Sequence, residues 1–181
     1  MRQSRALLEA NTQIWEKDGQ IFRFSAPSKS VYPFQWFWDS CFHAIVWAHF
    51  DIERAKDELR GLFAFQHPNG FIPHVIFWDK SRVRRTPFHW HYLESRGIWN
   101  FLPFWPKFKT TYLIQPPVLA QAVEKIYESG GGKEFLKEVL PVLTRYYSYL
   151  AEERDHDKDG LISIISQFES GLDFSPAYDP V

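Results

Sequence analysis

The sequence predicts an all-α protein built from helical hairpins. Apolar residues recur three and four positions apart over much of the 181-residue chain, as they do on the buried face of an amphipathic helix. Clusters of glycine and proline separate these stretches, and the sequence shows neither a strand-rich region nor an alternation of strands and helices. We therefore expect helix, loop and antiparallel helix to follow one another, with polar and aromatic residues gathered where helices meet loops.

The N-terminal segment begins with a candidate helix at residues 4–17. Leu7, Leu8 and Ile14 lie on one face of this helix, and Gly19 is expected to follow its end. Beyond that glycine, phenylalanines at positions 22 and 24 alternate with polar residues, a pattern typical of a short strand.

Two further helices are expected before residue 70. The first should begin at Asp39, whose carboxylate can accept hydrogen bonds from the free N–H groups of a first turn. The next follows Asp51, with Ala55, Leu59 and Leu62 in helical register. The run Gln-His-Pro-Asn-Gly at 66–70 should end it.

Residues 71–93 lack helical periodicity and contain two prolines, so we expect a long loop there, with room for a short hairpin. Loops of this length in compact domains often close over or bind a ligand. A helix at 93–101 is a weaker prediction, because Gly97 lies inside it and Pro103 follows it.

The C-terminal part contains two stronger helix predictions. Pro116 and Pro117 should open a helix that the three glycines at 130–132 end. A second helix is expected at 134–153, and Pro141 inside it would either kink it or start a new helix.

Bulk composition excludes several classes of partner. The formal net charge is −1, from 21 basic and 22 acidic residues, so we expect no nucleic-acid partner. A single cysteine, Cys41, excludes an internal disulfide and fits a reducing compartment. The N-terminus lacks the apolar block of a signal peptide and no run is long enough to span a membrane. We therefore expect a cytoplasmic protein without a membrane partner.

Aromatic residues are abundant, with 8 Trp, 8 Tyr and 17 Phe. Most should pack in the core, because large rings bury much apolar surface. Their clustering with Gln, Asp and His also suits a pocket with apolar walls and a few polar groups that orient a ligand.

A candidate catalytic acid lies in the segment Glu-Ser-Gly-Leu-Asp-Phe-Ser-Pro at 169–176. Asp173 follows a glycine among apolar and hydroxyl neighbours, where partial desolvation would raise its pKa and keep a proton available for general-acid catalysis. A solvated loop acid or a cap on a following helix is the alternative. Glu169 could be a second carboxylate beside it, although a structural role in holding the loop is favoured.

Three separated segments together resemble glycoside hydrolase family 63, especially its bacterial hydrolases of glucosylglycerate and mannosylglycerate. The acid motif is shared with the trehalases. The segments are Tyr-Pro-Phe-Gln-Trp-Phe-Trp-Asp-Ser at 32–40, Gly-Phe-Ile-Pro-His at 70–74 with Gln-Pro-Pro at 115–117, and residues 169–176. The resemblance implies an (α/α)6 toroid, of which this chain would be about half: a single partial domain over residues 1–181.

The same resemblance implies an inverting α-glycosidase with Asp173 as the catalytic acid. The general base would be a Glu in the second half of the barrel, beyond this chain. The residues implied to bind the sugar are Tyr32, Gln35, Trp36, Trp38, Asp39, His74, Gln115 and Gly171. Indole faces suit sugar C–H groups, while Asp and Gln can bond hydroxyls. Helix capping by Asp39 and core packing of Trp36 and Trp38 are the alternatives.

By this resemblance the favoured substrate is glucosylglycerate or mannosylglycerate. The next hypothesis is a trehalase-like α-glucosidase. An epimerase on the same type of barrel would depend instead on His74 or His91. A third alternative is a non-catalytic, carbohydrate-binding half-barrel, whose exposed apolar edge would favour a homo-oligomer.

We expect no metal and no cofactor. The segment Asp155-His156-Asp157-Lys158-Asp159-Gly160 has oxygens at the first, third and fifth positions of a calcium loop. Ser166 stands at the twelfth position, where such a loop has a bidentate Glu, so a polar turn between helices is favoured.

Overall fold

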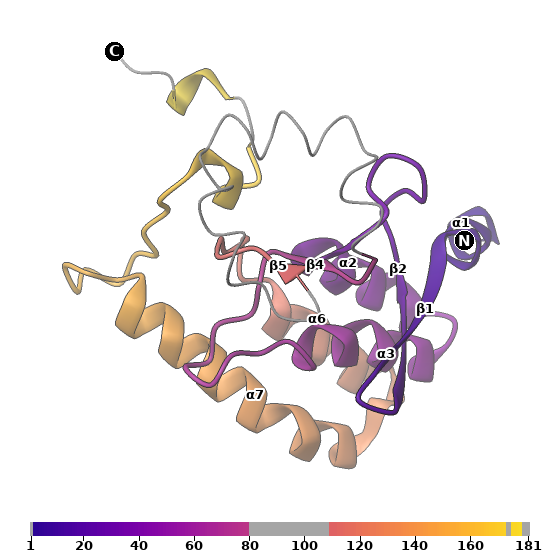
Figure 1. The fold of residues 1–181 in the computed structure, drawn as a ribbon. Coiled ribbons are helices and arrows are strands. Elements are labelled where there is room, and N and C mark those ends of the chain that lie inside the picture. The colour runs from indigo at the N-terminus through magenta and orange to yellow at the C-terminus, as the bar shows by residue number, and fades with distance from the viewer. Residues whose placement is uncertain (1, 80–108, 173–174, 179–181) are drawn as a thin grey trace.

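The computed structural model describes residues 2–79, 109–172 and 175–178, and its described residues are rich in helix (Figure 1). The helices are α1 (Arg2–Asn11), α2 (Phe37–Trp47), α3 (Ile52–Phe63), α6 (Leu119–Ile126) and α7 (Gly132–Glu153), with a π-helical turn η2 (Tyr127–Gly131) and 3-10 turns η3 (Gln167–Glu169) and η4 (Pro176–Tyr178). The strands are β1 (Thr12–Lys17), β2 (Gln20–Ser25), β3 (Gln35–Trp36), β4 (Val75–Phe77) and β5 (Lys109–Thr110).

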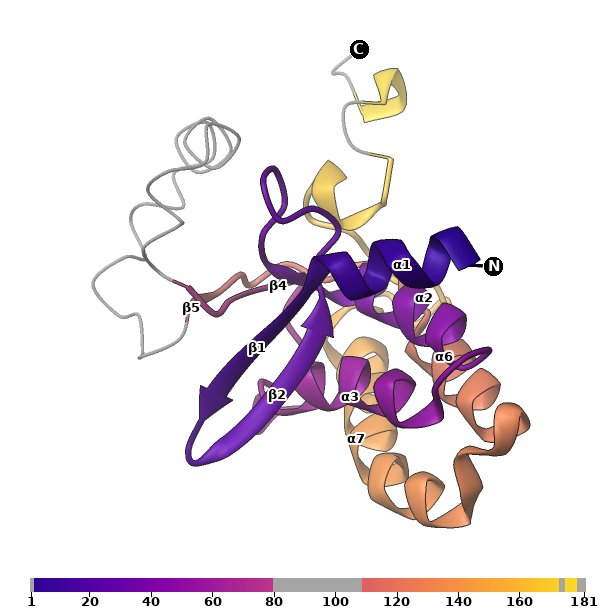
Figure 2. The same cartoon turned by 90° about the vertical axis from the view of Figure 1, so that its right-hand side faces the viewer.

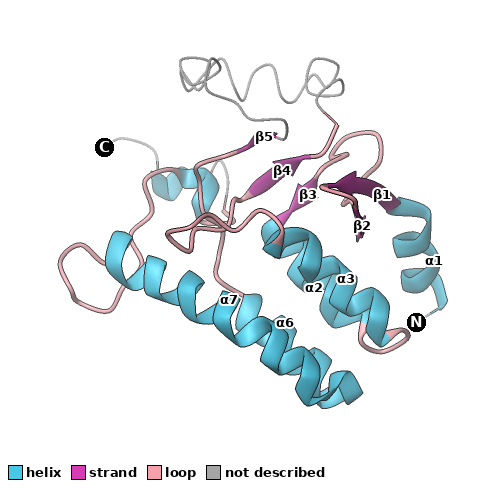
Figure 3. Cartoon of the chain, turned by 60° about the horizontal axis from the view of Figure 1, so that its bottom comes forward, coloured by secondary structure: helices cyan, strands magenta, loops and turns pink. Residues whose placement is uncertain are grey.

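Two helical hairpins lie side by side, as the sequence predicts. Helices α2 and α3 contact each other, α6 joins α7 through η2, and α2 also contacts α6 (Figure 3). Helix α3 follows Asp51 as predicted, and Asp51 caps it, since its carboxylate accepts a hydrogen bond from Arg54 N at 3.1 Å. Pro141 lies within α7, which runs unbroken from Gly132 to Glu153. The helix predicted at 93–101 and the loop residues 80–93 lie outside the described residues.

The prediction of one helix over residues 4–17 is wrong in its second half. Helix α1 ends at Asn11, and β1 pairs antiparallel with β2 in a register that joins Thr12 to Ser25 and Lys17 to Gln20. Asp18 and Gly19 form the turn, both with positive φ, 53° and 78°. An Asp-Gly pair adopts this conformation readily and its twist matches that of a hairpin. The hairpin lies against α3 (Figure 2).

Two other predictions need correction. Helix α2 begins at Phe37 with Trp36 as its N-cap, so Asp39 lies inside the first turn instead of capping it. Part of the expected loop is ordered strand, because Val75–Phe77 forms β4 between β3 and β5. This small sheet lies beyond the start of α2 (Figure 3).

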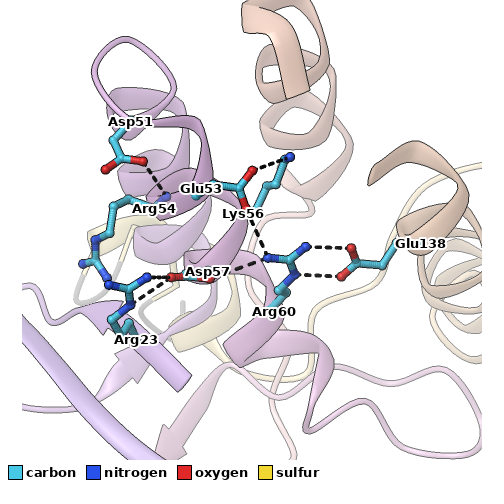
Figure 4. A network of polar contacts seen from close by, with 8 residues as sticks. All are labelled: Arg23, Asp51, Glu53, Arg54, Lys56, Asp57, Arg60 and Glu138. Atoms are coloured by element: carbon cyan, nitrogen blue, oxygen red, sulfur yellow. Dashed lines mark hydrogen bonds and ion pairs between the residues drawn. The ribbon is translucent and has the colours of Figure 1, made fainter. Parts of the chain in front are cut away.

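Charged side chains near the surface form a network that joins β2, α3 and α7 (Figure 4). Arg23 on β2 donates to Asp57 on α3 at 2.6 Å, and Arg60 on α3 forms a bidentate pair with Glu138 on α7, with both contacts at 2.8 Å. Exposed pairs of this kind stabilise by up to about 1 kcal/mol each. The apolar core beneath them therefore supplies most of the stability.

No helix among the described residues is long and apolar enough to cross a lipid bilayer.

A buried amide fixes β3 against α3. The side chain of Gln35 is fully buried, and its Nε2 donates to Ser40 Oγ at 3.2 Å and to the Glu58 carbonyl oxygen at 3.0 Å. Its Oε1 accepts from Trp78 Nε1 at 3.0 Å. The amide lies directly on Gly61 of α3, where an added Cβ would come within 2.7 Å of Gln35 Nε2.

Substitution of Gly61 by Ala tests this contact. In a helix interior the change normally stabilises by about 1 kcal/mol. Here the amide is held by three hydrogen bonds and cannot move away, so we expect Gly61→Ala to lower the free energy of unfolding by about 1–3 kcal/mol. Urea unfolding followed by circular dichroism measures this, and a gain in stability would show that the contact is absent.

Candidate functional site

Most of the predicted sugar-binding residues lie near the point where β3 runs into α2. Antiparallel pairing of Trp36 with Val75 brings His74 beside β3, and the Trp36 and His74 rings meet edge to face with centroids 5.0 Å apart. Tyr32 meets the Trp36 ring in the same manner at 5.7 Å. Tyr32 and Trp36 are partly exposed, whereas His74 is buried and its Nδ1 lies 3.2 Å from Thr111 Oγ1.

Trp38 is held by two segments distant in sequence. Its backbone N–H, free of a helical partner in the first turn of α2, donates to Gln115 Oε1 at 2.9 Å. Gly171 lies against its indole: a Cβ at Gly171 would overlap Trp38 Cη2 and lie 3.4 Å from Pro116 Cγ. Gly171 also has a φ of 74°, which disfavours any side chain there. Trp38, Gln115 and Gly171 therefore form one packed unit.

The side-chain amide of Gln115 uses only its oxygen in a hydrogen bond within the described residues. Because Trp38 N–H is a donor, the amide oxygen of Gln115 must face it, and this sets the direction of Nε2. Within the part of the chain that the structure describes, Gln115 Nε2 has no hydrogen-bond partner, so it can donate to a ligand hydroxyl.

Asp39 is partly buried in the first turn of α2. Desolvation raises its pKa from the ordinary 3.8 to about 6, and hydrogen bonds from its own backbone and from Trp38 oppose this rise. Trp36 carries another polar group at this site, since its Nε1 is buried and lacks a hydrogen-bond partner among the described residues. The site thus combines indole surfaces with a carboxyl group and an indole N–H.

A buried carboxylate organises the segment that leads to the predicted acid. Glu169 is 2 % exposed and accepts four hydrogen bonds: from Ile114 N at 2.9 Å, from Ile165 N at 2.7 Å, and from Arg154 Nη1 and Nη2 at 3.0 and 2.9 Å. These contacts favour the structural interpretation of Glu169. We call this group the Glu169 clamp. Asp173 itself lies outside the described residues.

The structure brings Tyr32, Trp36 and His74 together, and likewise Trp38, Gln115 and Gly171, while Asp39 follows Trp38 in the same helical turn. Gln35 lies apart, with its amide bound wholly inside the protein. Sequence reasoning did not single out Arg154. A basic residue beside an acidic turn reads as a surface charge, and its burial depends on contacts formed by folding.

Comparison with known proteins gives a consistent result. The family model described as "Mannosylglycerate hydrolase MGH1-like glycoside hydrolase domain" matches residues 32–181. A mannosylglycerate hydrolase of Thermus thermophilus is 35% identical over 161 residues, which are 86% of this chain and 37% of the relative. A glucosylglycerate hydrolase of Mycolicibacterium hassiacum is 34% identical over 161 residues, 82% of this chain and 34% of that protein.

Solved structures agree with the sequence comparison. The crystal structure of a GH63 mannosylglycerate hydrolase from Thermus thermophilus, in complex with Tris and D-glycerate, superimposes with a TM-score of 0.75 at 33% identity. The match covers 98% of this chain and 39% of that one. This chain therefore spans little more than a third of the length of these relatives.

The raised pKa of Asp39 predicts a specific pH dependence. Because the folded-state pKa of about 6 exceeds the ordinary 3.8, the contribution of Asp39 to stability is complete below pH 3.8 and is lost as the pH rises through 6. Between about pH 4 and pH 7, we expect the unchanged protein to lose about 2 kcal/mol more of its free energy of unfolding than Asp39→Asn does.

Urea unfolding of both proteins across this pH range measures the difference. Carboxyl ¹³C NMR should show a titration near pH 6 that disappears in Asp39→Asn. A titration near the ordinary pKa would contradict the burial of this group.

Removal of the charge at Glu169 should destabilise the fold strongly. Glu169→Gln leaves the Arg154 guanidinium buried opposite a neutral amide, and breaking a buried pair in this way costs about 3–5 kcal/mol. The matched control is Glu138→Gln, which removes the exposed partner of Arg60 and should cost less than about 1 kcal/mol. Equal losses for the two variants in urea unfolding would contradict a structural role for the clamp.

Proposed function

Because the chain belongs to the family of mannosylglycerate hydrolase MGH1-like glycoside hydrolase domains, we propose that it supplies part of the active site of an inverting glycoside hydrolase. The favoured substrate is a small α-glycoside, mannosylglycerate or glucosylglycerate, since relatives with both names match most of this chain. The observation that carries the proposal is the packed unit of Trp38, Gln115 and Gly171, anchored beside the Glu169 clamp.

Asp173 is the proposed general acid. It follows Gly171 by two residues in the sequence, and Gly171 is fixed against Trp38. The acid would give its proton to the glycosidic oxygen as the bond from that oxygen to the anomeric carbon breaks. A water molecule would add to the opposite face of the sugar while a carboxylate base takes its proton. In this proposal the base comes from a part of the enzyme outside residues 1–181.

The partly exposed rings of Tyr32, Trp36 and Trp38 would form the apolar wall of the sugar subsite. Flat aromatic surface suits the C–H faces of a pyranose. Gln115 would donate from Nε2 to a sugar hydroxyl, and Asp39 would accept from another. Their positions are set by α2, whose first turn carries Asp39 and the N–H that holds Gln115.

Two of the residues predicted to bind the sugar, Gln35 and His74, are better placed to support this wall than to touch a substrate. The amide of Gln35 is fully buried, with all of its recorded hydrogen bonds inside the protein, and His74 is 2 % exposed behind the edge of Trp36. We propose that both act as positioning residues for the aromatic wall.

The test uses the full enzyme that contains this chain, with Asp173→Asn and the matched control Asp18→Asn. Asp18 lies in the β1–β2 turn, where its positive φ also suits Asn. Proton NMR follows the sugar released from α-mannosylglycerate, α-glucosylglycerate and trehalose. From both glycerate glycosides we expect the β-anomer to appear first. We expect kcat to be about 10²–10⁴-fold lower for Asp173→Asn and unchanged for Asp18→Asn.

Each contrary result has a distinct meaning. Full activity of Asp173→Asn would remove this residue as the acid. Early α-anomer from either glycerate glycoside would indicate a retaining mechanism; trehalose does not give this test, because its leaving glucose is released as the α-anomer under either mechanism. Hydrolysis of trehalose alone would replace the glycerate glycosides as substrates. Saturable sugar binding without turnover by the unchanged enzyme would favour a carbohydrate-binding protein.

A further inference from the structure

The open end of the β1–β2 hairpin is bound by a buried carboxyl group. Ser25 ends β2, and its backbone N–H donates to both oxygens of Glu58 on α3, at 2.8 and 3.0 Å. Trp47 Nε1 on α2 donates to Glu58 Oε1 and to Ser25 Oγ, both at 3.2 Å. Glu58 and Ser25 are buried, so water does not reach this contact while the hairpin lies against α3 (Figure 2).

Arg54, one turn before Glu58 on α3, binds the other strand of the hairpin. Its Nη2 donates to Thr12 Oγ1 at 2.9 Å, and its guanidinium lies 5.0 Å from the centre of the Trp47 ring. Its Nη1 is buried and has no hydrogen-bond partner among the described residues. Arg54 and Glu58 therefore each bind one strand of the hairpin, and neither Nη1 nor Nη2 donates to the Glu58 carboxyl group.

Burial makes the charge of Glu58 depend on whether the hairpin is docked. Burial raises the pKa of Glu58 from the ordinary 4.5 to about 8, and the hydrogen bonds from Ser25 and Trp47 and the charge of Arg54 oppose this rise. Undocking would expose Glu58 to water and return its pKa toward 4.5. The contribution of Glu58 to docking is therefore complete below pH 4.5 and is lost as the pH rises through 8.

The other ionisable groups around this contact differ from Glu58 in the pH at which they change charge. On α2, His43 Nδ1 lies 3.0 Å from the Ser25 carbonyl oxygen, and burial lowers the pKa of His43 to about 4. Burial raises the pKa of the Cys41 thiol well above its ordinary value, and Arg54 stays charged. The pKa of Asp39, also on α2, is about 6, so the test below removes this residue by substitution.

We propose that Glu58 anchors the β1–β2 hairpin in a proton-dependent manner: the hairpin docks on the neutral carboxyl group and undocks more often as this group ionises. When the hairpin undocks, the O–H bond of the carboxyl group breaks and the proton passes to water. Docking reverses the step. The buried rings of Phe22 and Phe24 keep the docked state favoured, so the proton changes how often a rare opening occurs.

The hairpin also supports the segment that carries the aromatic wall. On β1, Gln13 Nε2 donates to the Pro33 carbonyl oxygen at 2.9 Å. On β2, Phe24 stacks on Trp78 with ring centroids 5.9 Å apart, and Trp78 Nε1 donates to the buried amide that fixes β3. Undocking of the hairpin would remove both contacts and loosen the wall.

Hydrogen exchange measures the opening without any activity assay, so its failure is distinct from failure of the proposed hydrolysis. The full enzyme that contains this chain, with Asp39→Asn as the background, is followed by mass spectrometry from about pH 5.5 to pH 7.5. After correction for the intrinsic pH dependence of amide exchange, we expect the opening constant of residues 12–25 to rise about tenfold per pH unit, because each opening releases one proton. Residues 31–36 should follow the hairpin, and α7 should not change.

Glu58→Gln is the test variant, because its amide keeps a hydrogen-bond acceptor for Ser25 and cannot ionise. The pH dependence of hairpin opening should disappear in it. Asp57→Asn is the matched control, since it removes the neighbouring acid on α3 that binds Arg23 of the same hairpin. It should raise the opening constant by up to about fivefold at every pH and keep the dependence on pH.

Carboxyl ¹³C NMR of the background enzyme gives a second measurement that does not require Glu58→Gln to fold. We expect the Glu58 carboxyl group to titrate near pH 8. A titration near 4.5, an opening constant that does not change with pH, or an equal pH dependence in Glu58→Gln or in α7 would overturn the proposal. Constant exchange at residues 31–36 would overturn the link to the wall.

Discussion

The buried pair of Glu169 and Arg154 is the interaction on which the candidate site depends. Both side chains are almost fully enclosed, and removing two charges from water is costly unless hydrogen bonds replace the lost solvation. Glu169 meets this requirement with four donors, two from Arg154 and two from the backbone at Ile114 and Ile165. One carboxylate thereby joins the end of α7, the segment before α6 and the turn η3, which are far apart in the sequence.

Further contacts extend from this pair to the aromatic wall. Ile114 is bonded to Glu169, and its neighbour Gln115 is bonded to the first turn of α2. Gly171 follows Glu169 by two residues and packs on Trp38. Trp38 thus contacts two segments that the clamp joins. The charge pair therefore supports the positions of Trp38 and Gly171, although it would not itself touch a ligand.

The sequence was a good guide to helices α3 and α7. Helical periodicity after Asp51 predicted α3, and the helix expected at 134–153 covers most of α7. The β1–β2 hairpin was missed although Asp18 and Gly19 are a strong local turn signal, because the apolar spacing before them also fits a helix. The pairing of Arg154 with Glu169 could not be predicted, since it depends on packing between separate elements. Motif resemblance indicated where the site lies, and the roles within it required the structure.

Two glutamines show how hydrogen bonding separates residues that resemblance treats alike. Gln35 and Gln115 both belong to segments that predict sugar binding. The amide of Gln35 uses both of its ends inside the protein and lies against Gly61, so any ligand contact would require breaking hydrogen bonds that support β3. The amide of Gln115 uses its oxygen on the first turn of α2, and this bond leaves its nitrogen available as a donor. The Gln35 amide is therefore suited to support the aromatic wall. The Gln115 amide is suited to donate a hydrogen bond to a hydroxyl of the sugar that binds against this wall.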